Sequence, residues 1–248
     1  RLIRGGYREI VLTGIHLGHY GVDRHRGTPK SEWMRLSHLV RDIAAIDGDF
    51  RVRLSSIEAT EVTRELMQVM ADHPRKVCPH LHVCMQSGSD AVLRRMKRRW
   101  GKKRFIDRCH MIKEHLNDPA LTTDIIVGFP GETDRDFEES CEAARNVGFS
   151  KIHIFPFSPR QGTPAAQMQN QVSSQVRSAR GRELVRVESE LRDKYFRRLL
   201  GKRLTVLVES PVRDQMHQLL GTACRYATIQ LASSHEAQPG NLVSVCAT

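Results

Sequence analysis

The chain has 248 residues, and 39 Lys and Arg against 28 Asp and Glu give it a formal net charge of +11. This length supports one large core, with or without a small appendage, and the basic excess favours a polyanionic partner, with a merely solvated basic surface as the alternative. No apolar run approaches the roughly 18 residues of a membrane helix and no signal peptide precedes the fold, so we expect a cytoplasmic, monomeric protein with no membrane partner.

Short apolar strands alternate with amphipathic helices along the first two thirds of the chain. Residues 1–6 resemble the last turn of a helix with its glycine stop. We expect strands at 9–13, 51–55, 80–86, 122–127 and 151–157, and helices near 32–46, 63–73, 91–98, 104–116 and 134–147. Regular alternation of this kind predicts a parallel α/β sheet, curved or barrel-like, with its site at the carboxyl ends of the strands.

The pattern changes after Pro164. Residues 167–178 are polar and predict a linker that enters a helix, and 183–200 have the spacing of a helix. From Gly201 onwards LTVLVE, LLGTACRYATIQL and LVSVCA predict a small all-β barrel with a core separate from the first. A β-extension of the main core is the alternative.

The segment TTDIIVGFPGE (122–132) combines an apolar run, a glycine turn and an acidic helix start. This is the position at which α/β proteins bind nucleotide-like ligands. Gly128 has no side chain to obstruct a flat ring that approaches the backbone. An ordinary turn is the alternative, in which Glu132 only complements the dipole of the following helix.

Six cysteines are scattered along the chain, and nothing indicates an oxidising compartment, so we expect free thiols. Cys78 and Cys84 bracket His80 and His82, which raises the question of a metal site. Alternation along a strand instead places His80, His82, Cys84 and Gln86 on one face. We therefore predict a polar strand face that lines a barrel cavity, with no metal.

Four further motifs, IVLTGIHLGHYG, RLSSIEAT, HLHVCMQSGSD and HIFPFSPRQGTP, accompany the glycine turn in a fixed order. Together they resemble the radical S-adenosylmethionine (SAM) methylthiotransferases, and most closely the MtaB-type branch, which acts on threonylcarbamoyladenosine in tRNA. The resemblance covers nearly the whole chain. It departs from the family in two ways: no CxxxCxxC is present, and Cys84 stands where a proline is usual.

The resemblance implies a partial radical-SAM (β/α) barrel at 1–165, a linker and helix at 166–200, and a TRAM-like RNA-binding β-barrel at 201–248. It also implies a transferase that adds a methylthio group to C2 of N6-threonylcarbamoyladenosine at tRNA position 37. That carbon carries an unactivated C–H bond beyond the reach of acid–base catalysis, so SAM and [4Fe-4S] clusters carry the chemistry. With no cluster ligands, this chain alone is expected to be inactive.

Three other readings remain open. They are a non-catalytic tRNA-binding module, a methylthiotransferase for another modified adenosine, and an unrelated (β/α) hydrolase or lyase.

The resemblance further implies that residues at the strand ends bind SAM, while no catalytic residue is assigned. The SAM-binding set is Thr13, Gly14, His16, Ser55, Ser56, Glu58, Gln86, Ser87, Asp124, Ile126, Gly128 and Phe129, with His153, Phe155 and Pro156 closing the floor. Ordinary structural roles compete with these: Ser55, Ser56 and Glu58 are typical strand-end residues, and Ser89 or Asp90 can cap a helix.

Basic residues crowd the segments 94–104 and 197–203. In a protein that resembles a tRNA-modifying enzyme, such clusters predict contacts to phosphates. The expected RNA-binding residues are Arg98, Arg99, Lys102, Arg198, Arg203 and Arg225. Charge that serves solubility alone is the alternative.

Overall fold

A parallel sheet forms the centre of the computed structural model, which describes residues 1–25, 27–29, 32–213, 218–232, 234 and 237–248. Its strands are β1 (Glu9–Leu12), β2 (Arg51–Leu54), β3 (Ser56–Ile57), β4 (His80–Val83), β5 (Ala120–Val127) and β6 (Lys151–Pro156). β1 pairs with β2, and β3-β4-β5-β6 pair in chain order, all in parallel. A bridge between Val52 and Val77 joins the two halves. The predicted incomplete (β/α) barrel is confirmed.

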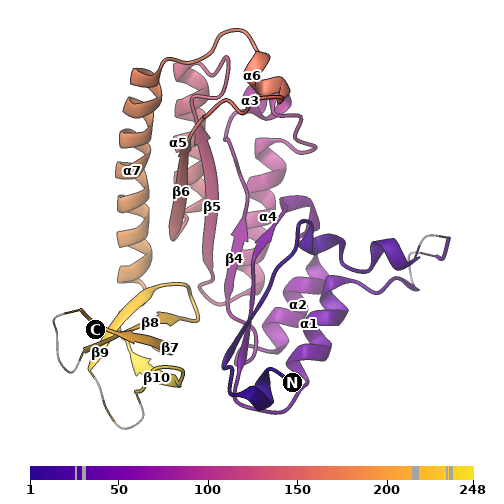
Figure 1. The fold of residues 1–248 in the computed structure, drawn as a ribbon, viewed down its shortest axis with the longest axis vertical. Helices are drawn as coiled ribbons and strands as arrows, with labels where there is room; N and C mark the ends of the chain where they lie inside the picture. The colour runs from indigo at the N-terminus through magenta and orange to yellow at the C-terminus, as the bar shows by residue number, and fades with distance from the viewer. Residues whose placement is uncertain (26, 30–31, 214–217, 233, 235–236) are drawn as a thin grey trace.

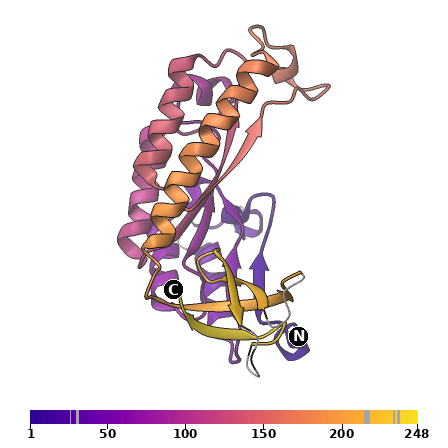
Figure 2. The same ribbon diagram turned by 90° about the vertical axis from the view of Figure 1, so that its left-hand side faces the viewer.

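The helices gather on one face of this sheet, and the opposite face carries none (Figures 1 and 2). They are α1 (Leu36–Ala44), α2 (Arg64–Asp72), α3 (Asp90–Arg95), α4 (Lys102–His115), α5 (Asp134–Val147), the short α6 (Pro164–Gln167) and α7 (Ser174–Arg197). Within the described part of the chain, none of these helices has the length and apolarity required to cross a membrane. The helix-free face is the one that can present side chains to a ligand.

Local capping explains where several elements begin and end. Thr133 and Asp136 form a capping box at the start of α5, and Gly148, with φ of 66°, ends it. α5 therefore has the bounds that the sequence predicted. β4, in contrast, stops at Val83 rather than at Gln86, because the Thr123 hydroxyl replaces backbone partners: it donates to the Val83 carbonyl (2.7 Å) and accepts the Met85 amide (2.9 Å).

The predicted linker at 167–178 is shorter in the structure, because 168–173 are irregular and the helix that the linker enters begins at Ser174. Ser173 caps α7 by accepting a hydrogen bond from the amide of Val176, so this 24-residue helix begins at Ser174. Leu184 and Val187 on its inner face are buried in the main core. Most residues of α7 are polar because only one narrow stripe of the helix is buried. A polar composition therefore did not show that the helix begins at Ser174.

The C-terminal unit is all-β, as predicted. Its strands are β7 (Arg203–Pro211), β8 (Gln218–Ala223), β9 (Thr228–Ala232) and β10 (Leu242–Cys246), which form a curled antiparallel sheet in the order β10-β7-β8-β9 (yellow in Figure 1). The turn before β8 and the polar loop after β9 lie partly outside the described residues.

The two units share a core at their junction, contrary to the prediction of separate cores. Ala120, which begins β5, is buried in one cluster with Tyr195 of α7 and with Leu204 and Val206 of β7. Polar contacts reinforce this apolar contact. The buried guanidinium of Arg51 donates to the carbonyls of Thr205 and Thr222, at 2.7 Å each, and Arg53 donates to those of Ala223 and Cys224.

Candidate functional site

A hollow of about 380 Å³ opens where β4 and β5 end. Its lining includes Gln86, Ile126 and Phe129, three of the predicted SAM-binding residues, together with Arg95 and Met168. Phe129 is 6% exposed, and its ring packs edge-on against that of Phe157 with the centroids 5.2 Å apart. The hollow thus combines an apolar wall with a few polar groups, which is the usual make-up of a small-molecule site.

Gln86 lines this hollow and has an uncommon, left-handed backbone conformation. A left-handed φ costs a non-glycine residue on the order of 1 kcal/mol. Two backbone hydrogen bonds to β5 maintain this conformation. The Gln86 amide donates to the carbonyl of Asp124 (2.8 Å), and the Ile126 amide donates to the carbonyl of Gln86 (2.9 Å). Such strain is typical of residues aimed at a ligand.

A second hollow, of about 270 Å³, adjoins the first, and Lys97 and Arg98 line both. It contains the predicted residues His16 and Glu58. Glu58 already has partners, because it accepts hydrogen bonds from the guanidinium of Arg98 (2.6 Å) and the indole of Trp100 (3.0 Å). These contacts fix the carboxylate at the rim between the two hollows.

Glu61 is a residue that the sequence interpretation missed. Its carboxylate, 6% exposed, accepts hydrogen bonds from the amides of Gly18 (3.2 Å) and Glu58 (3.3 Å). The rings of His16 and His19 lie 3.7 and 3.4 Å from it. Glu61 therefore ties the loop after β1 to the end of β3. Glu61 lies three residues after Glu58, which is the spacing of a capping box. This spacing was the feature of the sequence from which the role of Glu61 could have been predicted.

The glycine turn is closed, which corrects the expected approach of a ring to Gly128. A Cβ atom built on Gly128 would lie 2.2 Å from Cγ of Arg177, so α7 covers that side of the backbone. From within the turn, Glu132 accepts the Gly128 amide at 3.0 and 3.1 Å and pairs with the buried Arg180 at 2.8 Å. Burial raises the pKa of Glu132, although the hydrogen bonds from Gly128 and Arg180 oppose this shift. Glu132 braces the turn rather than serving the helix dipole alone.

Ser87 also lies away from both hollows. It is buried, and its hydroxyl lies 3.2 Å from that of Ser140 on α5, which is a packing role. Ser89 makes no side-chain cap and instead donates to Asp136. Asp90 does cap a helix, but that helix is α4, because it accepts the amide of Lys102 at 2.6 Å.

The remaining predicted strand-end residues line neither hollow. Thr13, Gly14 and Ser56 are exposed. The amide of Ser55 donates to the carbonyl of Leu12, which joins β2 to β1. Of the proposed floor residues, Phe155 is 50% exposed.

His80 and His82 lie on one face of β4, as predicted, but the strand ends before Cys84 and Gln86, and Gln86 lines the first hollow. His82 is 3.3 Å from Asp124, and the hydroxyl of Thr122 lies within hydrogen-bonding distance of both His80 (3.1 Å) and His82 (3.0 Å). Burial disfavours a charge on His82, but hydrogen bonds to Asp124 and Cys84 outweigh it and raise its pKa to about 9. For His153, burial and the neighbouring His82 lower the pKa.

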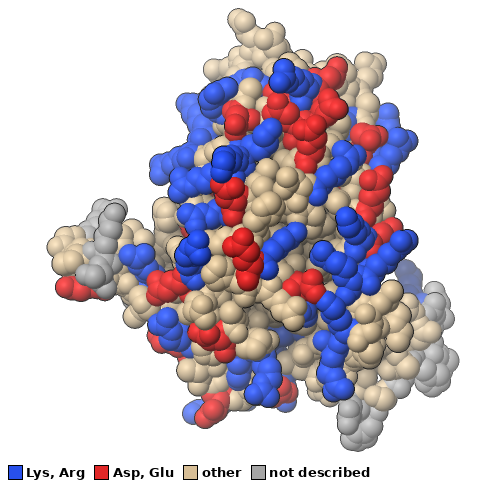
Figure 3. Space-filling view, turned by 180° about the vertical axis from the view of Figure 1, so that it is seen from behind, with Lys and Arg blue, Asp and Glu red and all other residues tan. Residues whose placement is uncertain are grey.

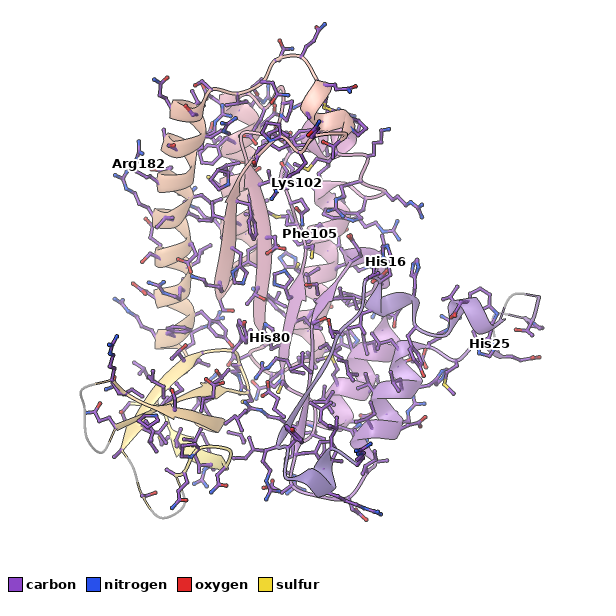
Figure 4. All side chains as sticks on the ribbon, viewed as in Figure 1. His16, His25, His80, Lys102, Phe105 and Arg182 are labelled. Atoms are coloured by element: carbon purple, nitrogen blue, oxygen red, sulfur yellow. The ribbon has the colours of Figure 1, made fainter. Side chains whose placement is uncertain are left out.

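His80 marks the end of this face that is nearest the C-terminal unit, and His16 lies towards the strand ends (Figure 4). The ring of Tyr226, from the loop between β8 and β9, stacks on that of His80 with centroids 4.6 Å apart. Burial and the nearby Arg53 charge lower the pKa of His80 well below its usual value, so this ring is neutral. The C-terminal unit therefore packs against this end of the polar face.

The six predicted RNA-binding residues differ in whether their side chains already have partners within the protein. Arg98 is paired with Glu58, Lys102 with Glu139 (3.3 Å), and Arg225 with the backbone carbonyls of Asn117 and Asp118. Arg99 and Arg203 are exposed and have no ion pair within the described part of the chain, while Arg198 lies over the ring of Tyr195. Figure 3 shows Lys and Arg spread over the helix-covered face and interleaved with Asp and Glu.

The six cysteines do not fit an iron–sulfur cluster, which requires several convergent thiolates. All six are free, and neither group of metal-competent side chains in the described residues includes a cysteine. Burial raises the pKa of Cys78 and of Cys109 to about 12, so these thiols stay protonated. The two hollows, by contrast, offer a ligand an apolar wall and several polar groups.

The fold and its site at the strand ends define a class of (β/α) protein, and the sequence identifies the family. Residues 1–144 match the model of the radical SAM superfamily, so the chain belongs to that superfamily. A solved structure of coproporphyrinogen III oxidase (HemN) from Escherichia coli, itself a radical SAM enzyme, shares the fold, with a TM-score of 0.51 and 14% identity over 63% of this chain and 36% of that one.

Within the superfamily the chain is similar to tRNA methylthiotransferases. It is 41% identical to the threonylcarbamoyladenosine tRNA methylthiotransferase MtaB of Thermotoga maritima over 84% of the chain and 46% of the relative. The MtaB of Bacillus subtilis is 38% identical over 86% and 46%. The tRNA-2-methylthio-N(6)-dimethylallyladenosine synthase of Corynebacterium jeikeium is 34% identical over 100% and 48%. The chain thus spans about half the length of the curated relatives it matches.

Proposed function

We propose that this chain is the barrel and C-terminal unit of a cytoplasmic, monomeric tRNA methylthiotransferase. The enzyme adds a methylthio group to C2 of N6-threonylcarbamoyladenosine next to the anticodon, at position 37. The observation that carries the proposal is 41% identity to the Thermotoga maritima MtaB, sustained over 84% of the chain. Identity to dimethylallyladenosine synthases of several bacteria is 34–38%, so methylthiolation of that adenosine is the alternative.

In this proposal the two adjoining hollows hold SAM. Ile126 and Phe129 form an apolar wall for the adenine, and Gln86 supplies hydrogen-bonding groups at the strand end. Glu58, fixed by Arg98 and Trp100, is placed to accept hydrogen bonds from the ribose or the methionyl group. When bound, SAM and the [4Fe-4S] clusters supply radical chemistry that side chains cannot perform. The ligands of those clusters lie outside these 248 residues.

Activity of the protein encoded by the complete gene tests this function. After anaerobic reconstitution it is incubated with SAM and two tRNA preparations, one with threonylcarbamoyl and one with dimethylallyl at the N6 of adenosine 37. We expect a methylthio group on the first substrate, detected by mass spectrometry of the nucleosides. Product on the second substrate alone would assign the other branch, and tRNA binding without any product would favour a non-catalytic module.

The 248-residue chain alone provides a second test. Because its cysteines do not converge, anaerobic reconstitution is expected to yield no stable [4Fe-4S] centre. Iron and sulfide content, together with the visible absorption of the desalted protein, is the measurement. Stoichiometric iron and sulfide would contradict the assignment of the cluster ligands to residues outside this chain.

A further inference from the structure

Three side chains on adjacent strands form a cluster that neither hollow includes: His82 of β4, Asp124 of β5 and His153 of β6. The strand register brings them together, because His82 is paired with Thr122, and Asp124 is paired with His153. Asp124 follows Thr122 by two residues and so lies on the same face of the sheet. Strands hold such a set more rigidly than loops do.

The spacing of the donor atoms is close to that of a metal site. One ligand atom from each of the three residues lies within 4.8 Å of the others, and Nε2 of His82 is 3.3 Å from Oδ2 of Asp124. Ligands about 2.1 Å from a tetrahedral ion are separated from one another by roughly 3.4 Å. His82 and Asp124 already have this separation, and a side-chain rotation of His153 completes the set.

The surroundings orient His82 for coordination. Its Nδ1 lies 3.0 Å from the hydroxyl of Thr122, which leaves Nε2 directed at Asp124. A metal-bound histidine usually has its second ring nitrogen held by such a partner. The ring of His153 makes no hydrogen bond within the described residues, so its nitrogens are available. The side chains of His82 and Asp124 are 13% and 25% exposed, which gives an ion access.

We propose that His82, Asp124 and His153 bind one divalent transition-metal ion, whose remaining coordination positions are open to solvent or to a ligand. Two imidazoles and a carboxylate suit Zn²⁺, Co²⁺, Ni²⁺ or Fe²⁺ better than Mg²⁺ or Ca²⁺, which prefer oxygen ligands. The site is separate from an iron–sulfur cluster, which thiolates bind. The proposal departs from the prediction from sequence that no metal binds here, and the titration below decides between them.

A second group, His16, His19 and Glu61, supplies the matched control. Its histidines are exposed, and its carboxylate already accepts two backbone amides. A metal drawn to any histidine pair beside a carboxylate would bind at both groups. The proposal requires selectivity for the cluster on the strands.

Titration of the chelator-treated 248-residue chain with Co²⁺, followed by visible absorption, tests the proposal. We expect one equivalent to bind, His153→Gln and Asp124→Asn each to weaken binding by more than about 10-fold, and His19→Gln to change it little. Circular dichroism verifies the fold of each variant, and His153→Gln is the informative one because it breaks no hydrogen bond.

Two results would overturn the site. One is the absence of Co²⁺ uptake up to about 1 mM, which would leave His82 and Asp124 as a plain ion pair. The other is binding that persists in well-folded His153→Gln and Asp124→Asn but is lost in His19→Gln.

Discussion

Glu132 and Asp134 bind the same guanidinium, that of Arg180, in opposite environments. The carboxylate of Glu132 is 2% exposed and that of Asp134 is 99% exposed, although both lie 2.8 Å from Arg180. Removing one partner of a buried pair leaves an uncompensated charge, whereas an exposed pair contributes little. Burial of the carboxylate, rather than its distance from Arg180, therefore decides how much each ion pair contributes to stability.

We therefore expect Glu132→Gln to lower the free energy of unfolding by on the order of 3 kcal/mol, because Arg180 stays buried without its counter-charge. Asp134→Asn, the matched control, should change it little. Urea unfolding of the two variants provides the comparison. Equal effects of the two substitutions would show that the pair with Glu132 does not brace the glycine turn.

Gly128→Val tests the closed turn directly. The substitution places a β-branched residue at φ of 73° and a Cβ atom 2.2 Å from Cγ of Arg177, so we expect a loss of about 1–3 kcal/mol in stability. The double variant with Arg177→Ala removes the contacts to Cγ and Cδ of Arg177 and leaves a Cβ–Cβ contact of 3.3 Å together with the backbone strain. Thermal melts should thus rank the double variant between wild type and Gly128→Val. A Gly128→Val protein as stable as wild type would mean that the turn opens readily and admits a ligand.

Single residues also show what the sequence could reveal about the site. Gln86, Ile126 and Phe129 were predicted correctly as neighbours, because strand ends of a parallel sheet converge. Ser87 and Gly128 were misplaced, since the sequence does not show which side of a turn a later helix covers. Covering residues such as Arg177 lie some 50 positions away in the chain.

At the scale of elements, α5 and α7 differ in how far capping residues in the sequence determine where each helix begins and ends. Thr133 and Gly148 give α5 both of its ends, so a sequence-based assignment of its bounds was correct. For α7, Ser173 is one serine among several polar residues, and burial of Leu184 and Val187 against the barrel stabilises the helix. Tertiary packing of that kind is hard to infer from the amino-acid composition of the helix.

Glu9 organises the junction between the barrel and the C-terminal unit. Its carboxylate accepts hydrogen bonds from Arg51 (2.6 Å) and Arg53 (2.8 Å), and those two guanidiniums then donate to carbonyls of β7 and β8 and of the turn after β8. Burial acts to raise the pKa of Glu9, but its bonds to Arg53 and Arg51 prevail and lower it. One carboxylate on β1 thus positions two cations that bind a distant sheet.

Replacing this carboxylate by Glu9→Gln is expected to cost on the order of 3 kcal/mol of stability, because both arginines lose their buried counter-charge. The contribution of a carboxyl with a lowered pKa is present above its ordinary value near 4.5 and is lost as the pH falls through the folded-state value. The stability difference between wild type and Glu9→Gln should accordingly shrink in acid below about pH 4.5. Asp49→Asn, in an exposed pair with Arg8, is the control. A difference that stays constant with pH would contradict the ionic role of Glu9.

On the scale of the whole molecule, the parallel barrel and the all-β unit were predictable from periodicity, but their shared core was not. Ala120, Tyr195 and Leu204 are ordinary apolar residues in sequence, and only the fold brings them together. Deleting 201–248 would expose this cluster and strip Arg51 and Arg53 of their acceptors, so it would damage the barrel as well.

Charge substitutions on the surface avoid that damage and provide the test of tRNA binding. Arg99, beside the second hollow, and Arg203, which begins β7, are exposed and have no ion pair in the described chain. If both touch phosphate, each releases a counterion, and Arg99→Ala with Arg203→Ala should flatten the slope of log affinity against log salt by about one to two units. Arg182→Ala serves as the control, because this exposed side chain points outward from α7 (Figure 4). Titration of labelled tRNA across salt concentrations gives the slopes. Equal slopes for the double variant and wild type, or the same flattening for Arg182→Ala, would mean that the basic residues act as a diffuse solvated surface rather than as phosphate contacts.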